Sequence, residues 1–236
     1  MATKPSKRYR KALEQVNPKQ VYPLKSAVEV LAKFPKAKFN ETVEVAFKLG
    51  VDAKQSDQMV RGTVPLPHGS GKTVKVLVFA KNGAAADAAR AAGAEYVGFD
   101  DMIKKCVEGW TDFDVAIATP DAMVEVRKLG KVLGPRGLMP NPKTGTVTED
   151  TAKAIREVKA GRVEFKLDKA GNVHVPVGKA SFTPVQIAEN ARAVIEAVAK
   201  ARPASVKGSY LQSCTLSATM SPPVRIDVRE FLASAA

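Results

Sequence analysis

The sequence contains few of the residues that form metal centres or covalent cross-links. Its 236 residues include two cysteines and two histidines. Cys106 and Cys214 are far apart and belong to no CxxC pair, which excludes a cysteine-rich zinc site and fits a reducing compartment. His68 and His174 have no second ligand at metal-binding spacing. We therefore expect no bound metal ion.

Long apolar segments are absent as well. No segment approaches the ~18 consecutive apolar residues of a membrane-spanning helix. Residues 1–16 carry several cations but no apolar core of secretory length, and their second half is typical of a helix. An organellar transit peptide would also be basic and poor in acids, but this basic stretch is short. We expect a soluble protein of the cytoplasm.

The sequence also lacks a complete nucleotide-binding or catalytic motif. Residues 69–73 (GSGKT) resemble the end of a P-loop, but the full motif would need glycine where Leu66 stands and a helix after Thr73. An apolar, strand-like run follows instead. No G-x-G-x-x-G is present after that run, and no Ser, Cys or Lys has a recognisable base partner. We therefore expect that the protein is not an enzyme and binds no cofactor. The competing hypothesis is a nucleotide-dependent enzyme.

What the sequence does contain is an excess of positive charge. Lys and Arg number 37 against 24 Asp and Glu, which gives a net charge of +13. Residues 69–160 hold 14 of these cations and 12 of these anions, so the outer segments hold the remaining 23 and 12. This excess of positive charge creates an electrostatic field that favours polyanionic partners, above all nucleic acid. A general DNA-binding regulator is a further hypothesis.

The two ends of the chain have the pattern of an open sheet with helices. Residues 24–32 repeat apolar side chains at helical spacing, whereas residues 42–49 alternate apolar and polar side chains as a strand does. Residues 162–168 and 173–177 are separated by a turn sequence and are predicted to form a hairpin. Residues 183–201 are the longest predicted helix.

The middle of the chain differs from both ends. Residues 74–79 (VKVLVF) are mostly apolar, and the Ala-rich residues 84–92 follow. This is the pattern of a buried parallel strand with its crossover helix, and it recurs further along. We predict an α/β fold (α+β plus α/β) in which residues 1–68 and 161–236 form one discontinuous open-sheet β-α-β domain. Residues 69–160 form an inserted Rossmann-like, three-layer α/β domain.

Two polar groups in the discontinuous domain are candidates for contacts with RNA. Lys36 and Lys38 precede Phe39 in a helix-to-strand connection, which would present cations beside an aromatic face. Alternatively, Phe39 belongs to the core and the lysines form a solvated rim. The second group lies at the predicted hairpin and consists of Lys166, Asp168 and Lys169.

Residues 130–147 (GKVLGPRGLMPNPKTGTV) are unusually rich in Gly and Pro, and we expect neither a regular helix nor a strand there. So many conformationally restricting residues indicate one specified backbone path. Lys131, Arg136 and Lys143 make this segment basic. It is either a shaped structural loop or an auxiliary phosphate contact through these three cations.

Seven segments carry a family resemblance. They are KFNETVE from residue 38, SDQMVRGTVPLPHGSGK from 56, ATPDAM from 118, GKVLGPRGLMPNPKTGTV from 130, VKAG from 158, PVGKASF from 176 and Thr219-Met220. Together they run over nearly the whole chain, and several are long and irregular. The sequence resembles the bacterial large-subunit ribosomal protein one family.

The resemblance implies that the discontinuous domain binds large-subunit rRNA at the mobile exit-side stalk of the ribosome. It also implies a part in releasing deacylated tRNA from the exit site and, as in many bacterial members, repression of translation from its own operon mRNA. The large ribosomal subunit and these three RNAs would be its partners. The RNA surface of the family, carried over position by position, consists of Lys38, Phe39, Thr42, Lys166, Asp168, Lys169, Ser213, Thr219 and Met220.

This sequence departs from the family at one position of that surface. The family usually has Thr-Met-Gly-Pro, whereas Ser221 follows Met220 here. Glycine would permit a positive φ angle or a close approach of RNA to the backbone. Ser221 must therefore either fit with an ordinary φ angle or tighten the contact, and we include it among the candidate RNA-binding residues.

Overall fold

The structure is a computed structural model that describes residues 5–81 and 83–232. The chain divides into two compact units. The split unit consists of Met1–Gly71 with Gly161–Ala236, and the inserted unit consists of Lys72–Ala160. The predicted α/β class is confirmed, because the two units together contain helices and several β-sheets.

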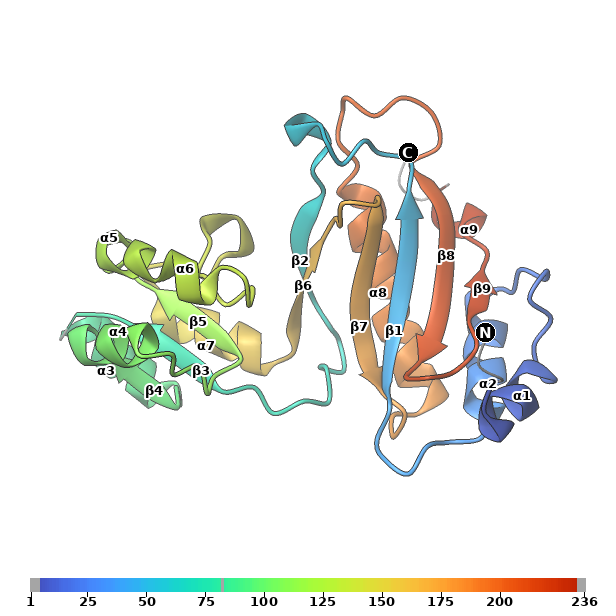
Figure 1. The fold of residues 1–236 in the computed structure, drawn as a ribbon, viewed down its shortest axis with the longest axis horizontal. Coiled ribbons are helices and arrows are strands. Elements are labelled where there is room, and N and C mark those ends of the chain that lie inside the picture. The colour runs from blue at the N-terminus through green and yellow to red at the C-terminus, as the bar shows by residue number, and fades with distance from the viewer. Residues whose placement is uncertain (1–4, 82, 233–236) are drawn as a thin grey trace. The chain divides into compact units, whose positions relative to one another are not determined.

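The split unit contains a four-stranded antiparallel sheet (Figure 1). Its strand order is β7 (Asn172–Lys179), β1 (Thr42–Leu49), β8 (Leu211–Ala218) and β9 (Val224–Ile226). A separate antiparallel pair is formed by β2 (Arg61–Pro65) and β6 (Arg162–Lys166). β1 is central because it pairs with both β7 and β8, which come from the other end of the chain. The sheet therefore joins the two ends of the sequence.

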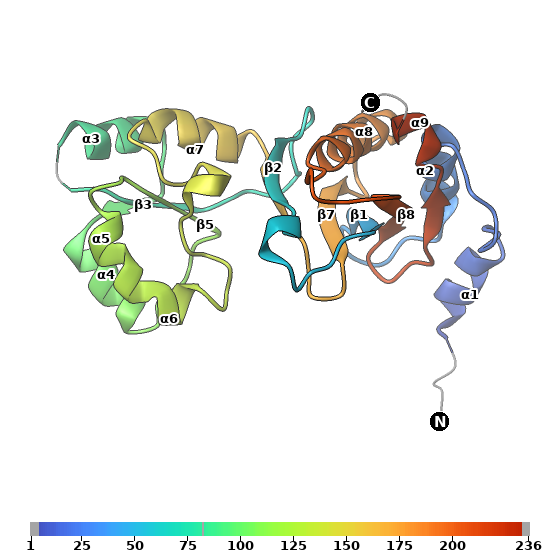
Figure 2. The same ribbon diagram turned by 90° about the horizontal axis from the view of Figure 1, so that it is seen from above.

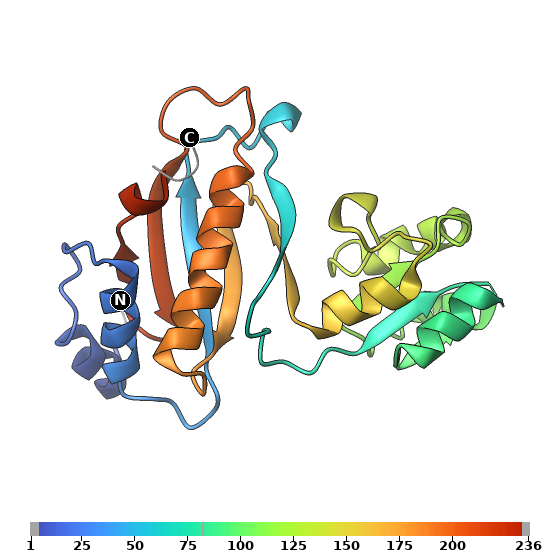
Figure 3. The ribbon, with the colours of Figure 1, turned by 180° about the vertical axis from the view of Figure 1, so that it is seen from behind.

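Helices cover one face of this sheet (Figures 2 and 3). α2 (Leu24–Lys33) and α8 (Pro184–Lys200) place their apolar residues in the core with the buried side chains of β1. Thr183 caps α8 in a reciprocal capping box with Gln186. The remaining helical segments of the unit are α1 (Lys7–Leu13), η1 (Ser56–Gln58) and α9 (Arg229–Leu232).

The predicted hairpin between residues 162–168 and 173–177 is wrong. The turn between these segments is present, but β6 pairs with β2 and β7 pairs with β1. β7 alternates buried and exposed side chains, so it gains more apolar burial beside central β1 than it would in an isolated two-stranded ribbon. The sequence pattern marked the strands and the turn but not their partners.

The inserted unit is a three-layer α/β sandwich (Figure 2). Its parallel sheet has the order β4 (Tyr96–Gly98), β3 (Val76–Phe79) and β5 (Val115–Ala118). One face carries α3 (Ala84–Ala91) and α7 (Thr151–Lys159); the other carries α4 (Asp100–Val107), α5 (Met123–Val126), η2 (Arg127–Leu129) and α6 (Gly130–Leu133). All four residues of β3 are buried, and they alternate between two separate apolar clusters. This explains the continuous apolar run in the sequence.

Residues 130–147 are more regular than expected. The segment begins with the helical turn α6, and a 3-10 turn, η3 (Pro142–Thr144), follows later. Leu133 is fully buried and ties the first turn to the core, which overrides the weak helix preference of the neighbouring glycines. The backbone on either side of Val147 then bonds to Ala118 at the edge of β5. The expectation that the segment has no regular helix is therefore wrong.

The GSGKT segment leads directly into β3, and no helix follows it. Lys72 forms an ion pair with Asp114, and this hydrogen bond lowers the pKa of the Asp114 carboxyl. Among the residues described, no group of three His, Cys, Asp or Glu side chains could hold a metal ion. No described helix is long and apolar enough to cross a membrane.

Candidate nucleic-acid interface

One face of the four-stranded sheet lies opposite the layer formed by α2 and α8 (Figures 1 and 3). Alternate side chains of each strand point to this open face. They are mostly small or polar: Thr42, Glu44, Ala46 and Lys48 from β1, His174 and Pro176 from β7, and Ser213, Thr215 and Ser217 from β8. The face can therefore accommodate a polar partner but offers little apolar surface.

Seven of the candidate residues gather where β1 begins and β8 ends. We call this group the Thr42 cluster: Lys36, Lys38, Phe39, Thr42, Thr219, Met220 and Ser221. Its centre is a set of hydrogen bonds between two threonines. The Thr219 hydroxyl accepts from the Thr42 N–H at 3.0 Å and donates to the Thr42 carbonyl oxygen at 3.2 Å. The Thr219 N–H also donates to that carbonyl, at 3.0 Å.

Two large apolar side chains of the Thr42 cluster are exposed. Phe39 is 53% exposed and Met220 is 72% exposed. The alternative in which Phe39 belongs to the core is therefore wrong: it stands in the connection before β1, not among the alternating residues that β1 buries. Lys36 and Lys38 are exposed on the same connection, and the Lys36 ammonium donates to the carbonyl of Ala180 at 3.3 Å. Cations thus accompany an accessible aromatic ring.

Ser221 adopts an ordinary φ angle, since the positive value in this turn belongs to Met220 (φ 62°). The Ser221 hydroxyl accepts from the N–H of Ala218 at 2.9 Å and donates to the carbonyl of Pro222 at 3.2 Å. It therefore bonds within its own turn. Of the two possibilities left open by the sequence, the structure supports a serine that fits without backbone strain.

The other four candidates lie at the opposite end of β1. Lys166, Asp168 and Lys169 are exposed at the β6–β7 turn, and Ser213 pairs with Lys48 near the end of β1. The Asp168 carboxylate accepts from the backbone N–H groups of Asn172 (2.6 Å) and Ala170 (2.8 Å). These bonds, led by that from Asn172, hold the pKa of Asp168 below its ordinary value. Asp168 thus stabilises the turn, and Lys166 and Lys169 lie on either side of it in the sequence.

The candidates therefore form two groups on one sheet. Thr42 and Lys48 are six residues apart on β1, which corresponds to roughly 20 Å along a strand. Small side chains such as Ala46 and Thr215 lie between the two groups on the open face. A folded nucleic acid lying along β1 could reach both.

Comparison with known proteins identifies the family of this chain. The family model of the ribosomal protein L1p/L10e family matches residues 31–222. The chain is 54% identical over 227 residues to the "Large ribosomal subunit protein uL1" of Protochlamydia amoebophila (strain UWE25), covering 96% of each chain. The chain belongs to the ribosomal protein L1p/L10e family.

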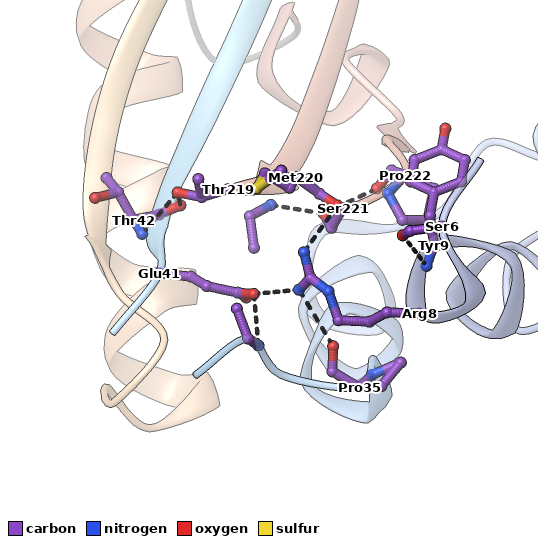
Figure 4. A network of polar contacts seen from close by, with 12 residues as sticks. Ser6, Arg8, Tyr9, Pro35, Glu41, Thr42, Thr219, Met220, Ser221 and Pro222 are labelled. Carbon is purple, nitrogen blue, oxygen red and sulfur yellow. Dashed lines mark hydrogen bonds and ion pairs between the residues drawn. The ribbon is translucent and has the colours of Figure 1, made fainter. Parts of the chain in front are cut away.

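In this member of the family, sequence reasoning missed three residues that shape the Thr42 cluster. The Lys179 ammonium donates to the Thr42 hydroxyl at 2.8 Å. Arg8 and Glu41 form a partly buried ion pair beside Met220 (Figure 4). No local pattern could reveal these pairs, because their members are 33 or more residues apart in sequence. Glu41 and Lys179 lie inside segments that carry the family resemblance, and this placement was the only signal in the sequence.

The three cations proposed as auxiliary RNA contacts lie in the inserted unit of this L1p/L10e chain. Lys131, Arg136 and Lys143 are all exposed, and the Arg136 guanidinium donates to the Thr111 hydroxyl. Thr144 is buried in the same segment, and Asn141 bonds to the backbone of Lys143 at 2.8 Å. These internal bonds favour the interpretation as a shaped structural loop, while the exposed cations leave the auxiliary contact to be tested.

Proposed function

We propose that this protein is a structural constituent of the large ribosomal subunit and binds large-subunit rRNA through the Thr42 cluster. The observation that carries the proposal is the exposure of Phe39 and Met220 beside Lys36 and Lys38. Apolar side chains of this size at a basic, polar site can stack on bases or ribose while the lysines attract phosphate. Family membership and the name of the relative from Protochlamydia amoebophila support the same assignment.

The second group extends the proposed contact. Lys166, Lys169 and Ser213 would meet a more distant part of the same RNA, with Asp168 keeping the turn in shape. The small side chains between the groups suit recognition by shape and 2′-hydroxyls, since they cannot reach into a deep groove. Lys131, Arg136 and Lys143 are proposed only as auxiliary contacts.

The finer parts of the proposal rest on the family resemblance. The protein would act in the cytoplasm at the mobile exit-side stalk, assist release of deacylated tRNA from the exit site, and repress translation of its own operon mRNA. The mRNA role has a structural consequence: the same Thr42 cluster would bind both RNAs, so they would compete. A translation reporter fused to the operon leader would be repressed by the protein and relieved by excess rRNA fragment.

The main experiment is chemical footprinting on large-subunit rRNA followed by filter binding to the protected fragment. We expect one protected region and saturable binding that exceeds binding to duplex DNA of equal length. Comparable affinity for the duplex would support a general DNA-binding regulator instead. Calorimetric titration with ATP and NAD tests the enzyme hypothesis, which predicts saturable heat from one of them.

A further inference from the structure

Arg8 connects three backbone segments that are far apart in sequence (Figure 4). Its guanidinium pairs with the Glu41 carboxylate, lies 3.5 Å from the Pro35 carbonyl oxygen, and donates to the Met220 carbonyl oxygen at 3.3 Å. One side chain thus joins α1, the connection that carries Phe39, and the turn after β8. The planar fork of arginine suits this task because it presents several donors in fixed directions.

Glu41 is the partner that fixes the connection. Its side chain is only 6% exposed, and the oxygen that meets Arg8 also accepts from the N–H of Ala37 at 2.8 Å. A carboxylate so nearly buried is tolerated because it is paired with a cation and hydrogen-bonded. The pair therefore holds both ends of the segment in which Lys38 and Phe39 are exposed.

Met220 is the residue that most needs such support. Its φ angle of 62° lies in the left-handed region, which residues with a side chain adopt at an energetic cost. Its side chain is largely exposed, so packing does not fix it. The backbone is held instead by the Arg8 bond to its carbonyl and by the flanking bonds of Thr219 and Ser221.

α1 is itself anchored, so Arg8 is a fixed point. The Ser6 hydroxyl caps the helix by accepting from the Tyr9 N–H at 3.2 Å. Ala12 and Val16 are buried in the core of the split unit. The guanidinium is consequently held in place relative to the sheet.

We propose that the Arg8–Glu41 pair positions the Phe39 connection and the Met220 turn for RNA without contacting the RNA itself. This rests on the proposed function, because the site being positioned is the Thr42 cluster. A site ordered before binding loses less conformational entropy when the complex forms. The pair then acts on the lifetime of the complex, whereas exposed lysines act on its salt dependence.

The decisive variant is Glu41→Gln, because two explanations predict opposite signs. If charge alone mattered, removing an anion from an RNA-binding protein would strengthen binding. If Glu41 positions the site, loss of the ion pair weakens binding by roughly tenfold or more through faster dissociation. Glu29→Gln is the matched control: Glu29 is an exposed glutamate of α2, in the helical layer opposite the open face, and its neutralisation should leave binding equal or tighter.

Arg8→Lys separates positioning from direct phosphate contact. The charge is kept, but a single ammonium cannot reach the carboxylate and both carbonyl groups with the same geometry. We expect faster dissociation with an unchanged slope of log affinity against log salt. A slope lowered by about one in Arg8→Ala, with unchanged dissociation in Arg8→Lys, would identify Arg8 as a phosphate ligand and overturn the proposal.

The measurements use the full chain and the rRNA fragment protected in footprinting, with surface plasmon resonance for the rates. Hydrogen exchange of the free protein provides an RNA-independent readout: peptides covering residues 35–41 and 218–222 should exchange faster in Glu41→Gln. Arg8→Ala combined with Glu41→Gln should weaken binding no more than the stronger single change, since both break one contact. Circular dichroism at the working temperature establishes that each variant is folded.

The outcomes distinguish the two proposals. If wild-type protein fails to bind the fragment, the proposed function fails and the positioning role fails with it. If Phe39→Ala and Thr219→Val weaken binding but folded Glu41→Gln and Arg8→Lys do not, only the positioning role is overturned. Additive effects of the Arg8 and Glu41 changes would also overturn it.

Discussion

The hydroxyl of Thr219 is bonded to the backbone of Thr42, accepting from its N–H at 3.0 Å and donating to its carbonyl at 3.2 Å. The two residues are 177 positions apart in the sequence. Thr42 begins β1 and Thr219 follows the last residue of β8, so this pair closes the end of the sheet. The hydroxyl that the sequence suggested as an RNA contact is therefore already used to hold the Thr42 cluster together.

Replacing Thr219 with valine should weaken RNA binding. Valine keeps the branched shape but removes the hydroxyl, so the Thr42 N–H loses its partner at a cost of about 1 to 3 kcal/mol. Filter binding with the protected rRNA fragment measures the effect. Thr219→Ser is the matched control, because it keeps the hydroxyl and should bind within a few-fold of wild type. A loss of affinity in Thr219→Ser with none in Thr219→Val would show that the methyl group and not the hydroxyl matters.

Phe39→Ala should weaken RNA binding without destabilising the fold. Phe39 is half exposed, so its truncation removes little buried apolar area. Loss of stacking on a base is worth about 1 to 3 kcal/mol. For this variant, binding titrations should therefore show a loss of RNA affinity, whereas urea unfolding should show little change in folding stability. Phe47→Ala provides the contrast. The Phe47 side chain lies within β1 and is 1% exposed, so its truncation should cost about 3 to 5 kcal/mol of folding stability.

Lys36→Ala and Lys38→Ala should each reduce the salt dependence of binding. Removing one lysine–phosphate interaction lowers the slope of log affinity against log salt by somewhat less than about one. Titrations at several salt concentrations measure this slope. Lys200→Ala serves as the control, since this exposed lysine ends α8 on the helical layer of the same unit. A slope that changes equally in all three variants would point to net charge and not to a local interaction.

Tyr210→Phe should stabilise the split unit. The Tyr210 ring is buried, and its hydroxyl has no hydrogen-bond partner among the residues that the structure describes. Removing such a group should raise the free energy of unfolding by about 1 kcal/mol, measured by urea denaturation. Tyr22→Phe is the control of opposite sign, because the Tyr22 hydroxyl accepts from the Asn17 N–H at 3.1 Å. A destabilised Tyr210→Phe variant would contradict the assignment of an unpaired hydroxyl.

The same residue leads to a prediction for alkaline pH. Burial raises the pKa of Tyr210 to about 12, from an ordinary value of 10. The folded state thus holds this proton more tightly than the unfolded state, so the contribution to stability is complete below pH 10 and is lost as pH rises towards 12. A pH titration followed by tyrosinate absorbance should show that one of the four tyrosines loses its proton only as the pH approaches 12. In Tyr210→Phe that late step should be absent.

Local sequence patterns and composition were sufficient to predict the local structure and the uneven distribution of charge. Period-two alternation in residues 42–49 and helical spacing in residues 24–32 follow from burial on one face, so both elements formed as predicted. The motif segments identified the family, and the outer segments carry the excess of cations. These properties depend on residues close together in the chain or on composition alone.

Which segments pair with one another depends on the tertiary fold. The predicted hairpin failed because β7 finds its partner in β1, more than a hundred residues away, where both strands gain a shared apolar core. Residues 130–133 became helical because Leu133 is buried. The Thr42–Thr219 bonds and the Arg8–Glu41 pair likewise join positions whose proximity no local pattern encodes. Long-range pairing depends on the packing of the whole unit, and that packing decided how the candidate RNA-binding residues are arranged.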